Sequence, residues 1–111
     1  MTIEITPFIQ VVTTVEKQDQ ARELTARVVA DRLAACAQIV GPIESTYHWD
    51  GRIENGQEWM CVFKTSRELY PELERAIRER HPYSCPEILA VPIVAGNRAY
   101  LNWLRKELRR G

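Results

Sequence analysis

Side chains that could bind a metal ion lie in two separate parts of the sequence. His81 and Cys85 are four residues apart, so a turn between them could bring an imidazole and a thiolate onto one ion. Thiolate suits Cu(I), and a zinc site usually needs about four ligands, so Glu87 or another subunit would have to complete such a site. Cys36, much earlier in the chain, is a further soft ligand. Cys36, His81 and Cys85 are therefore the candidate ligands for copper or zinc.

Two of these three residues also have a purely structural interpretation. Cys36 follows an apolar helical stripe and suits a small buried position. His81 follows a predicted helix, where a protonated imidazole would interact favourably with the helix dipole. His48 is best explained as a surface or interface residue of a strand, and Cys61 as a packed one. No CxxC or HExxH pattern is present to strengthen the metal interpretation.

Lys64 is a candidate for ligand binding of a different kind. It ends an apolar segment, and a lysine at a strand end beside a cleft could hold an anionic ligand or could extend along the surface into solvent. Trp49 and Tyr83 are large aromatic residues, which pack or anchor interfaces more often than they stack on ligands. The sequence contains no Ser, His and carboxylate set at a recognisable spacing and no glycine-rich phosphate loop. We therefore predict no catalytic residues and no enzymatic activity.

Length and charge limit the classes of protein that this chain can belong to. Its 111 residues favour a single domain over residues 1–111. Lys plus Arg and Asp plus Glu both number 15, which argues against a non-specific nucleic-acid binder and against attraction to acidic membranes. No apolar run could span a bilayer, and the first residues do not resemble a secretory signal. Three cysteines are an odd number, and without a secretory signal we expect them to be free thiols in a cytoplasmic protein. We expect no required cofactor.

Hydrophobic periodicity predicts four strands and three helices. The order is strand, helix, strand, strand, helix, strand, followed by a final helix. The expected strands cover residues 8–15, 36–54 with an interruption at Gly41–Pro42, 58–65 and 88–94, and the expected helices cover residues 19–35, 71–80 and the segment after Asn97 that carries Tyr100, Leu101, Leu104 and Leu108.

Turn and proline signals refine this pattern. Asn55–Gly56 is a strong hairpin signal and predicts a tight turn between two long strands. Pro71 places the start of the second helix, and Pro82 disfavours helical geometry at His81. Pro92 cannot donate to a strand ladder and marks an edge or a bulge.

Two β-α-β units joined by a hairpin form a ferredoxin-like α+β fold, with one antiparallel sheet and two helices on one face. The other face of the sheet is left uncovered by this pattern. Because an open apolar sheet rarely faces water, we expect an oligomer. The hairpin is long for so small a domain, so part of it should project past the core or pair with another chain.

Five segments together resemble one known family. The resemblance spans residues 8–108 and is carried by Leu33-Ala34-Ala35-Cys36, Ser45-x-Tyr47-x-Trp49-x-Gly51, Lys64-Thr65, His81-Pro82-Tyr83-x-x-Pro86-Glu87-Ile88 and Tyr100-Leu101-x-Trp103-Leu104. The chain is similar in these segments to the CutA family of small proteins linked to tolerance of divalent cations, copper especially. The resemblance implies a homotrimer with the architecture of the PII signalling proteins, in which shared polar residues gather in clefts between subunits. The matching positions are Trp49, Lys64, His81, Tyr83 and Glu87.

The chain departs from the family pattern at a few positions. His48 stands where an aromatic residue is frequent, Ser84 and Cys85 replace a polar and an apolar residue, and Thr13 replaces a cysteine of some members. A site that depends on that first-strand thiol is therefore not expected here, and Cys85 either compensates for it or is a neutral substitution.

Two functions remain in competition. The first is a metal-tolerance protein that binds divalent ions, copper in particular, in or near the clefts between subunits of a homotrimer. The second is a PII-like signalling or scaffold trimer that binds a small anion or a partner protein, with Trp49, Lys64, Tyr83 and Glu87 lining the cleft.

Overall fold

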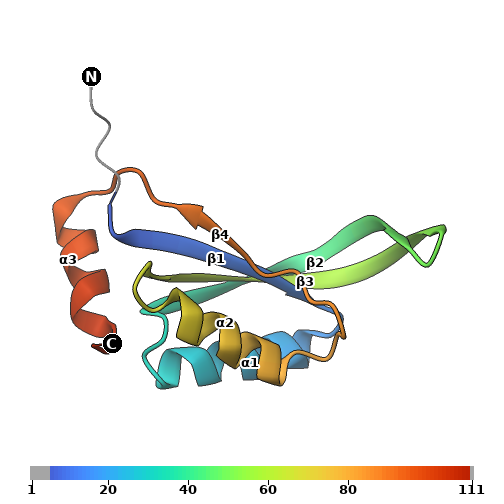
Figure 1. Cartoon of the computed structure of the whole chain (residues 1–111), viewed down its shortest axis with the longest axis horizontal. Coiled ribbons are helices and arrows are strands. Elements are labelled where there is room, and N and C mark those ends of the chain that lie inside the picture. The colour runs from blue at the N-terminus through green and yellow to red at the C-terminus, as the bar shows by residue number, and fades with distance from the viewer. Residues whose placement is uncertain (1–5, 111) are drawn as a thin grey trace.

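A four-stranded antiparallel sheet with three helices makes up the fold (Figure 1). The computed structural model describes residues 6–110. The strands lie in the order β2-β3-β1-β4, with each strand antiparallel to its neighbours, which confirms the ferredoxin-like prediction. In chain order, the elements are β1 (Phe8–Val15), α1 (Gln18–Ala30), β2 (Cys36–Trp49), β3 (Arg52–Ser66), α2 (Tyr70–Arg80), β4 (Leu89–Pro92) and α3 (Arg98–Glu107).

One face of the sheet packs on helices α1 and α2. Alternate residues of the central strands point into this layer, because side chains on a strand alternate between its two faces. The main core is continuous across both helices and the sheet, and its fully or almost fully buried members include Val11, Val15, Leu24, Val28, Cys61, Phe63, Leu73 and Ile77. The prediction that Cys61 is packed is confirmed.

The opposite face of the sheet carries apolar residues without a helical layer over them. Val12 lies opposite Val62 on one side and Leu89 on the other, and Val40 lies opposite Met60. Val40 and Leu89 are exposed. Helix α3 packs at one end of the sheet, near Phe8, and the β2–β3 hairpin extends from the opposite end (Figure 1). The expected uncovered face is therefore present in the single chain.

Helix α1 ends five residues before the predicted end at Ala35. Arg32 has a φ of 57°, in the left-handed region, and the backbone reverses there. The N–H of Leu33 donates to the Val28 carbonyl and that of Arg32 to the Val29 carbonyl, which is the hydrogen-bond pattern of a Schellman motif. The prediction was wrong because Leu33 and Ala35 are apolar at helical spacing, although they are buried from a loop.

The tight turn of the long hairpin lies at Asp50–Gly51, and the prediction of a turn at Asn55–Gly56 was wrong. Asp50 and Gly51 have φ values of 53° and 77°, as a two-residue type I′ turn requires. Asn55 instead lies inside β3 opposite Thr46, whose hydroxyl donates to the Asn55 amide oxygen at 2.9 Å. Consequently β2, the first strand of the hairpin, ends at Trp49, five residues before its predicted end at Glu54.

The remaining boundaries agree closely with the sequence. Pro71 lies in the first turn of α2, His81 is its C-cap residue and Asn97 is the N-cap residue of α3. β4 is an edge strand that ends at Pro92, two residues before the predicted end. The register of β2 and β3 shifts between Val40 and Ile43, at the predicted interruption.

Candidate functional site

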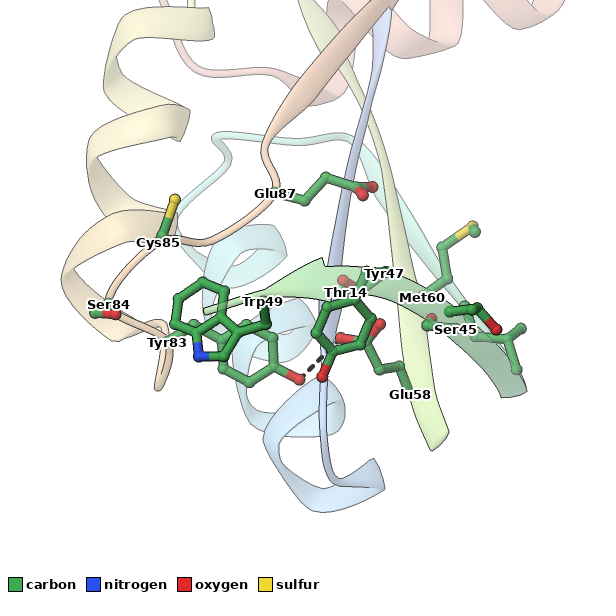
Figure 2. Close-up of a pocket in the computed structure, with 12 residues that line it drawn as sticks. Thr14, Ser45, Tyr47, Trp49, Glu58, Met60, Tyr83, Ser84, Cys85 and Glu87 are labelled. Carbon is green, nitrogen blue, oxygen red and sulfur yellow. Dashed lines mark hydrogen bonds between the residues drawn. The ribbon is translucent and has the colours of Figure 1, made fainter. Parts of the chain in front are cut away.

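A cleft of about 700 Å³ lies where the hairpin leaves the body of the sheet (Figure 2). Its walls come from the end of β1, the inner residues of the hairpin and the loop between α2 and β4. The lining residues are Thr14, Ile43, Ser45, Thr46, Tyr47, Trp49, Glu58, Met60, Tyr83, Ser84, Cys85 and Glu87. None of these described residues is Lys, Arg or His, whereas two are glutamates, so the cleft has a negative character.

A hydrogen bond across the cleft joins the α2–β4 loop to the hairpin. The Tyr83 hydroxyl donates to Oε2 of Glu58 at 2.8 Å, and the rings of Tyr47 and Trp49 line the same cleft (Figure 2). Burial raises the pKa of the Tyr83 phenol, and the hydrogen bond to Glu58 and the negative charges of Glu58 and Glu16 raise it further. Tyr83 therefore stays protonated and keeps donating its proton to Glu58 at ordinary pH.

His81 holds the same loop in place from below the cleft. Its Nε2 lies 2.8 Å from the Thr14 carbonyl oxygen, and the Tyr83 backbone N–H donates to its Nδ1 at 3.1 Å. Because Nδ1 accepts a hydrogen bond, the ring is neutral and Nε2 is the nitrogen that carries the proton. Burial lowers the pKa of His81, against opposing effects of the Thr14 hydrogen bond and the Glu58 charge. Both nitrogens are thus engaged, and the imidazole is neither a free ligand nor a charged helix cap.

Cys36 lies at the other end of the open face, in a separate polar group. Its sulfur is 3.5 Å from the Tyr100 hydroxyl, with either atom able to donate, and Gln38 Nε2 lies 3.9 Å from the same sulfur. Lys64 is the strand partner of Cys36, and its ammonium group donates to Gln38 Oε1 at 2.7 Å. The contact with Cys36, together with burial, raises the pKa of Tyr100 to about 12.

The structure therefore divides the residues that the sequence suggested. Trp49, Tyr83, Cys85 and Glu87 line one cleft, with His81 bonded beneath it. The other two, Lys64 and Cys36, lie together but outside the lining of this cleft.

Thr14, Tyr47 and Glu58 are among the cleft residues that the sequence reasoning did not name as site residues. The two-residue period of a strand puts Tyr47 on the same face as Trp49, and this signal could have found it. Glu58 faces the cleft because the observed register of β2 and β3 places it opposite Ile43. The predicted turn at Asn55–Gly56 gave a different register and therefore could not identify Glu58.

Residues 6–110 of one chain do not form a complete metal site. Among residues 6–110, no three His, Cys, Asp or Glu side chains come together closely enough to hold a metal ion. Figure 2 shows the Cys85 thiol and the Glu87 carboxylate on the same loop, with the thiol directed away from the aromatic rings. A divalent ion in this cleft would need donors from a second subunit as well.

Sequence comparison assigns the chain to a family. Residues 9–107 match the family described as CutA1 divalent ion tolerance protein. The chain belongs to the CutA1 family. Named relatives are the divalent-cation tolerance protein CutA of Thermus thermophilus, 42% identical over 96 residues that cover 86% of this chain and 93% of the relative, and that of Escherichia coli, 35% identical over 104 residues that cover 94% and 93%. The CutA1 family is known for cation tolerance and not as an enzyme family, in line with the absence of a predicted catalytic set.

Solved CutA1 structures share the same fold. The chain superposes on CutA1 from Oryza sativa with a TM-score of 0.93 at 34% identity, covering 96% of this chain and 98% of that structure. The Thermus thermophilus structure gives a TM-score of 0.89 at 39% identity, covering 92% and 99%. One curated relative from Oryza sativa is named chloroplastic, and one solved structure, from Archaeoglobus fulgidus, is named periplasmic. Among the described residues, no helix has the length and apolar character needed to cross a membrane.

Proposed function

We propose that this CutA1 protein acts in divalent-cation tolerance as a homotrimer that binds the cation, copper in particular, in or near the clefts between its subunits. The observation that carries this proposal is the composition of the cleft. Glu58 and Glu87 supply carboxylates, Cys85 supplies a soft ligand, and none of the described lining residues is basic. A cavity with this lining attracts cations and repels anions.

The alternative function, a PII-like trimer that binds a small anion, has less support. It depends on Lys64 as the positive group of the cleft. Lys64 lies outside the cleft lining and already donates to Gln38. An anion in the cleft would lie close to Glu58 and Glu87 without a compensating cation from this chain. A PII-like scaffold that binds a partner protein would instead use the exposed aromatic residues of the hairpin.

Within the cleft, Cys85 and Glu87 are the best candidate ligands. Both lie on the loop after α2, and Cys85 is exposed as a free thiol. His81 would have to give up its bond to Thr14 or to Tyr83 before it could bind a metal, and Cys36 belongs to the other polar group. Since thiolate favours Cu(I), a site built on Cys85 should prefer copper over Mg²⁺ or Ca²⁺.

The homotrimer is supported by what one chain leaves uncovered. Val40, Leu89 and Val91 are exposed on the open sheet face. These apolar side chains lie on one sheet face with no helix over them, and a second copy of the chain could cover them. Three free thiols also favour a reducing compartment, and we place the protein in the cytoplasm for that reason.

Native mass spectrometry of the reduced protein with and without Cu(I) or Zn(II) tests both parts of the proposal. We expect a trimer that takes up a fixed number of ions per subunit. Cys85→Ser combined with Glu87→Gln should lower this number, and Cys36→Ser is the matched thiol control that should leave it unchanged. Detection of a monomer would contradict the proposed homotrimer. Unchanged uptake in the double variant, or loss in the control, would overturn the assignment to the cleft.

A further inference from the structure

The cleft combines aromatic rings with negative charge in a way that metal binding does not use. Tyr47, Trp49 and Tyr83 all line it, from the hairpin and from the facing loop. Tyr47 is 45% exposed and Trp49 is 54% exposed in the single chain, so the chain's own atoms leave part of each ring uncovered. Figure 2 shows these rings gathered near the Tyr83–Glu58 hydrogen bond, with Glu87 also directed into the cleft.

Charges around the rings favour a positively charged guest. Glu58 and Glu87 line the cleft, and Glu16 is close enough to Tyr83 to raise the pKa of its phenol. Tyr83 donates its proton to a carboxylate, which shifts electron density into the ring and strengthens the negative potential of its face. An aromatic face attracts a cation through its quadrupole, and several such faces together recognise alkylated ammonium groups.

The polar groups of the cleft are also held in position before any ligand arrives. His81 fixes the Tyr83 backbone and is itself anchored on Thr14, while Glu58 fixes the Tyr83 hydroxyl. A ligand would therefore lose little binding free energy to ordering of this wall of the cleft. Metal ligands need lone pairs, and a ring face offers none, so the aromatic residues indicate a second kind of cation.

We propose that the cleft binds a small organic cation, an alkylated or quaternary ammonium group, between the rings of Tyr47, Trp49 and Tyr83 and beside the carboxylates of Glu58 and Glu87. This inference goes beyond the proposed metal-related function and does not require metal binding by Cys85. The neutral part of the ligand contacts the apolar wall formed by Ile43 and Met60.

Isothermal titration calorimetry of the full metal-free chain with choline tests this inference. The control ligand is the uncharged choline analogue in which carbon replaces the quaternary nitrogen, because it has the same shape without the charge. We expect choline to bind and the analogue to bind about tenfold more weakly or not at all. Equal binding of the two compounds, or no binding of either at millimolar concentration, would overturn the proposal.

Two variants locate the binding to this cleft. Trp49→Leu should weaken choline binding about tenfold, whereas Trp103→Leu, at another exposed indole that lies on α3 and does not line the cleft, should leave it unchanged. Glu87→Gln removes only a charge, so it tests the proposal even if Trp49→Leu alters assembly, and it should also weaken choline binding. Unchanged affinity in Glu87→Gln, or an equal loss in Trp103→Leu, would count against this location.

A third variant separates this proposal from metal binding. Cys85→Ser should lower copper uptake and leave choline affinity unchanged, while Trp49→Leu should do the reverse. Loss of both copper uptake and choline binding in Cys85→Ser would show that the ammonium group does not bind between the aromatic rings proposed here. Absence of copper uptake in the unmodified protein would overturn only the metal proposal, because the calorimetry is performed without metal.

Discussion

The polar groups at the two ends of the open sheet face differ in the strength and the partners of their hydrogen bonds. At the cleft end, His81 and Tyr83 form hydrogen bonds of 2.8–3.1 Å to backbone groups and to the Glu58 carboxylate. At the other end, the contacts of Cys36 with Tyr100 and Gln38 are 3.5 and 3.9 Å long and join side chains only. Backbone partners are fixed by the fold, whereas exposed side-chain partners are free to move, so we expect the cleft end to be the more rigid.

The charges at the two ends differ as well. The cleft has carboxylates and no basic residue among its described lining, while the Cys36 end has the ammonium group of Lys64. A cation is therefore attracted to the first and repelled from the second. Each of the two predicted sets of site residues, the metal ligands and the cleft residues, is thus divided between the two ends. Substitution at each end can test this difference.

The largest effect on stability is expected from His81→Ala. The substitution leaves the Thr14 carbonyl and the Tyr83 N–H without their partners, and it should lower the free energy of unfolding by about 2–3 kcal/mol. Urea unfolding at one fixed protein concentration measures this loss. His48→Ala, at the exposed histidine of the hairpin, is the matched control and should change stability by less than about 0.5 kcal/mol. Equal losses in the two variants would mean that His81 does not anchor the loop.

A smaller effect is expected from pH. Burial lowers the pKa of His81 in the folded chain, so the unfolded chain binds more protons as the pH falls below its unfolded value near 6.5. Stability should therefore be fully present above that value and should decrease as the pH falls toward the folded pKa. His81→Gln removes this titration, and the difference between wild type and variant across roughly pH 7.5 to 5, the range in which histidine titrates, isolates it. Parallel curves for the two proteins would contradict the neutral ring.

The phenols of the half-buried Tyr83 and the exposed Tyr100 provide the next comparison. Tyr83→Phe removes a 2.8 Å hydrogen bond to a carboxylate and should cost about 1 kcal/mol, while Tyr100→Phe removes a weak contact with sulfur and should cost less than about 0.5 kcal/mol. The same urea experiment measures both. If Tyr100→Phe proved the more damaging, the Cys36 end would be the more ordered of the two.

Much of the fold was predictable because burial leaves a periodic pattern in the sequence. The apolar run at residues 8–15 and the alternation within residues 58–65 correctly identified two strands, although β3 begins at Arg52 and is longer than predicted. The hairpin turn was not predictable from local signals, since Asp-Gly and Asn-Gly both suit a type I′ turn. A turn at Asn55–Gly56 would pair Asp50 with Cys61, whereas the observed register pairs Ile39 with that buried residue. Long-range burial thus decides the register.

The candidate site was only partly predictable, for a different reason. Trp49, Tyr83 and Glu87 were identified through the family resemblance, and the structure brings them to one cleft. The bonds of His81 could not be predicted, because one partner is a backbone carbonyl of a distant strand and such a group leaves no signal in the sequence. Lys64 was also assigned to the cleft through the family resemblance, but its strand neighbour is Cys36 at the opposite end of the open face.

The smallest difference is expected in the reactivity of the thiols at the two ends. Cys85 is exposed, whereas Cys36 is partly covered and contacts Tyr100, so Cys85 should be alkylated by iodoacetamide a few-fold faster. Cys61 is an internal reference, because burial raises the pKa of its thiol to about 11 and the folded chain should protect it until it unfolds. Mass spectrometry of peptides after timed alkylation measures all three rates.

Tyr100→Phe then sharpens this comparison of the two ends. Removing the hydroxyl takes away the contact with the Cys36 sulfur, so the rate at Cys36 should change while the rates at Cys85 and Cys61 stay the same.

A trimer that covers the cleft would instead slow Cys85 alone, and dilution below the concentration at which subunits dissociate would restore its rate. If Cys36 remained the faster thiol in the dissociated protein, the greater exposure of the cleft end would be contradicted.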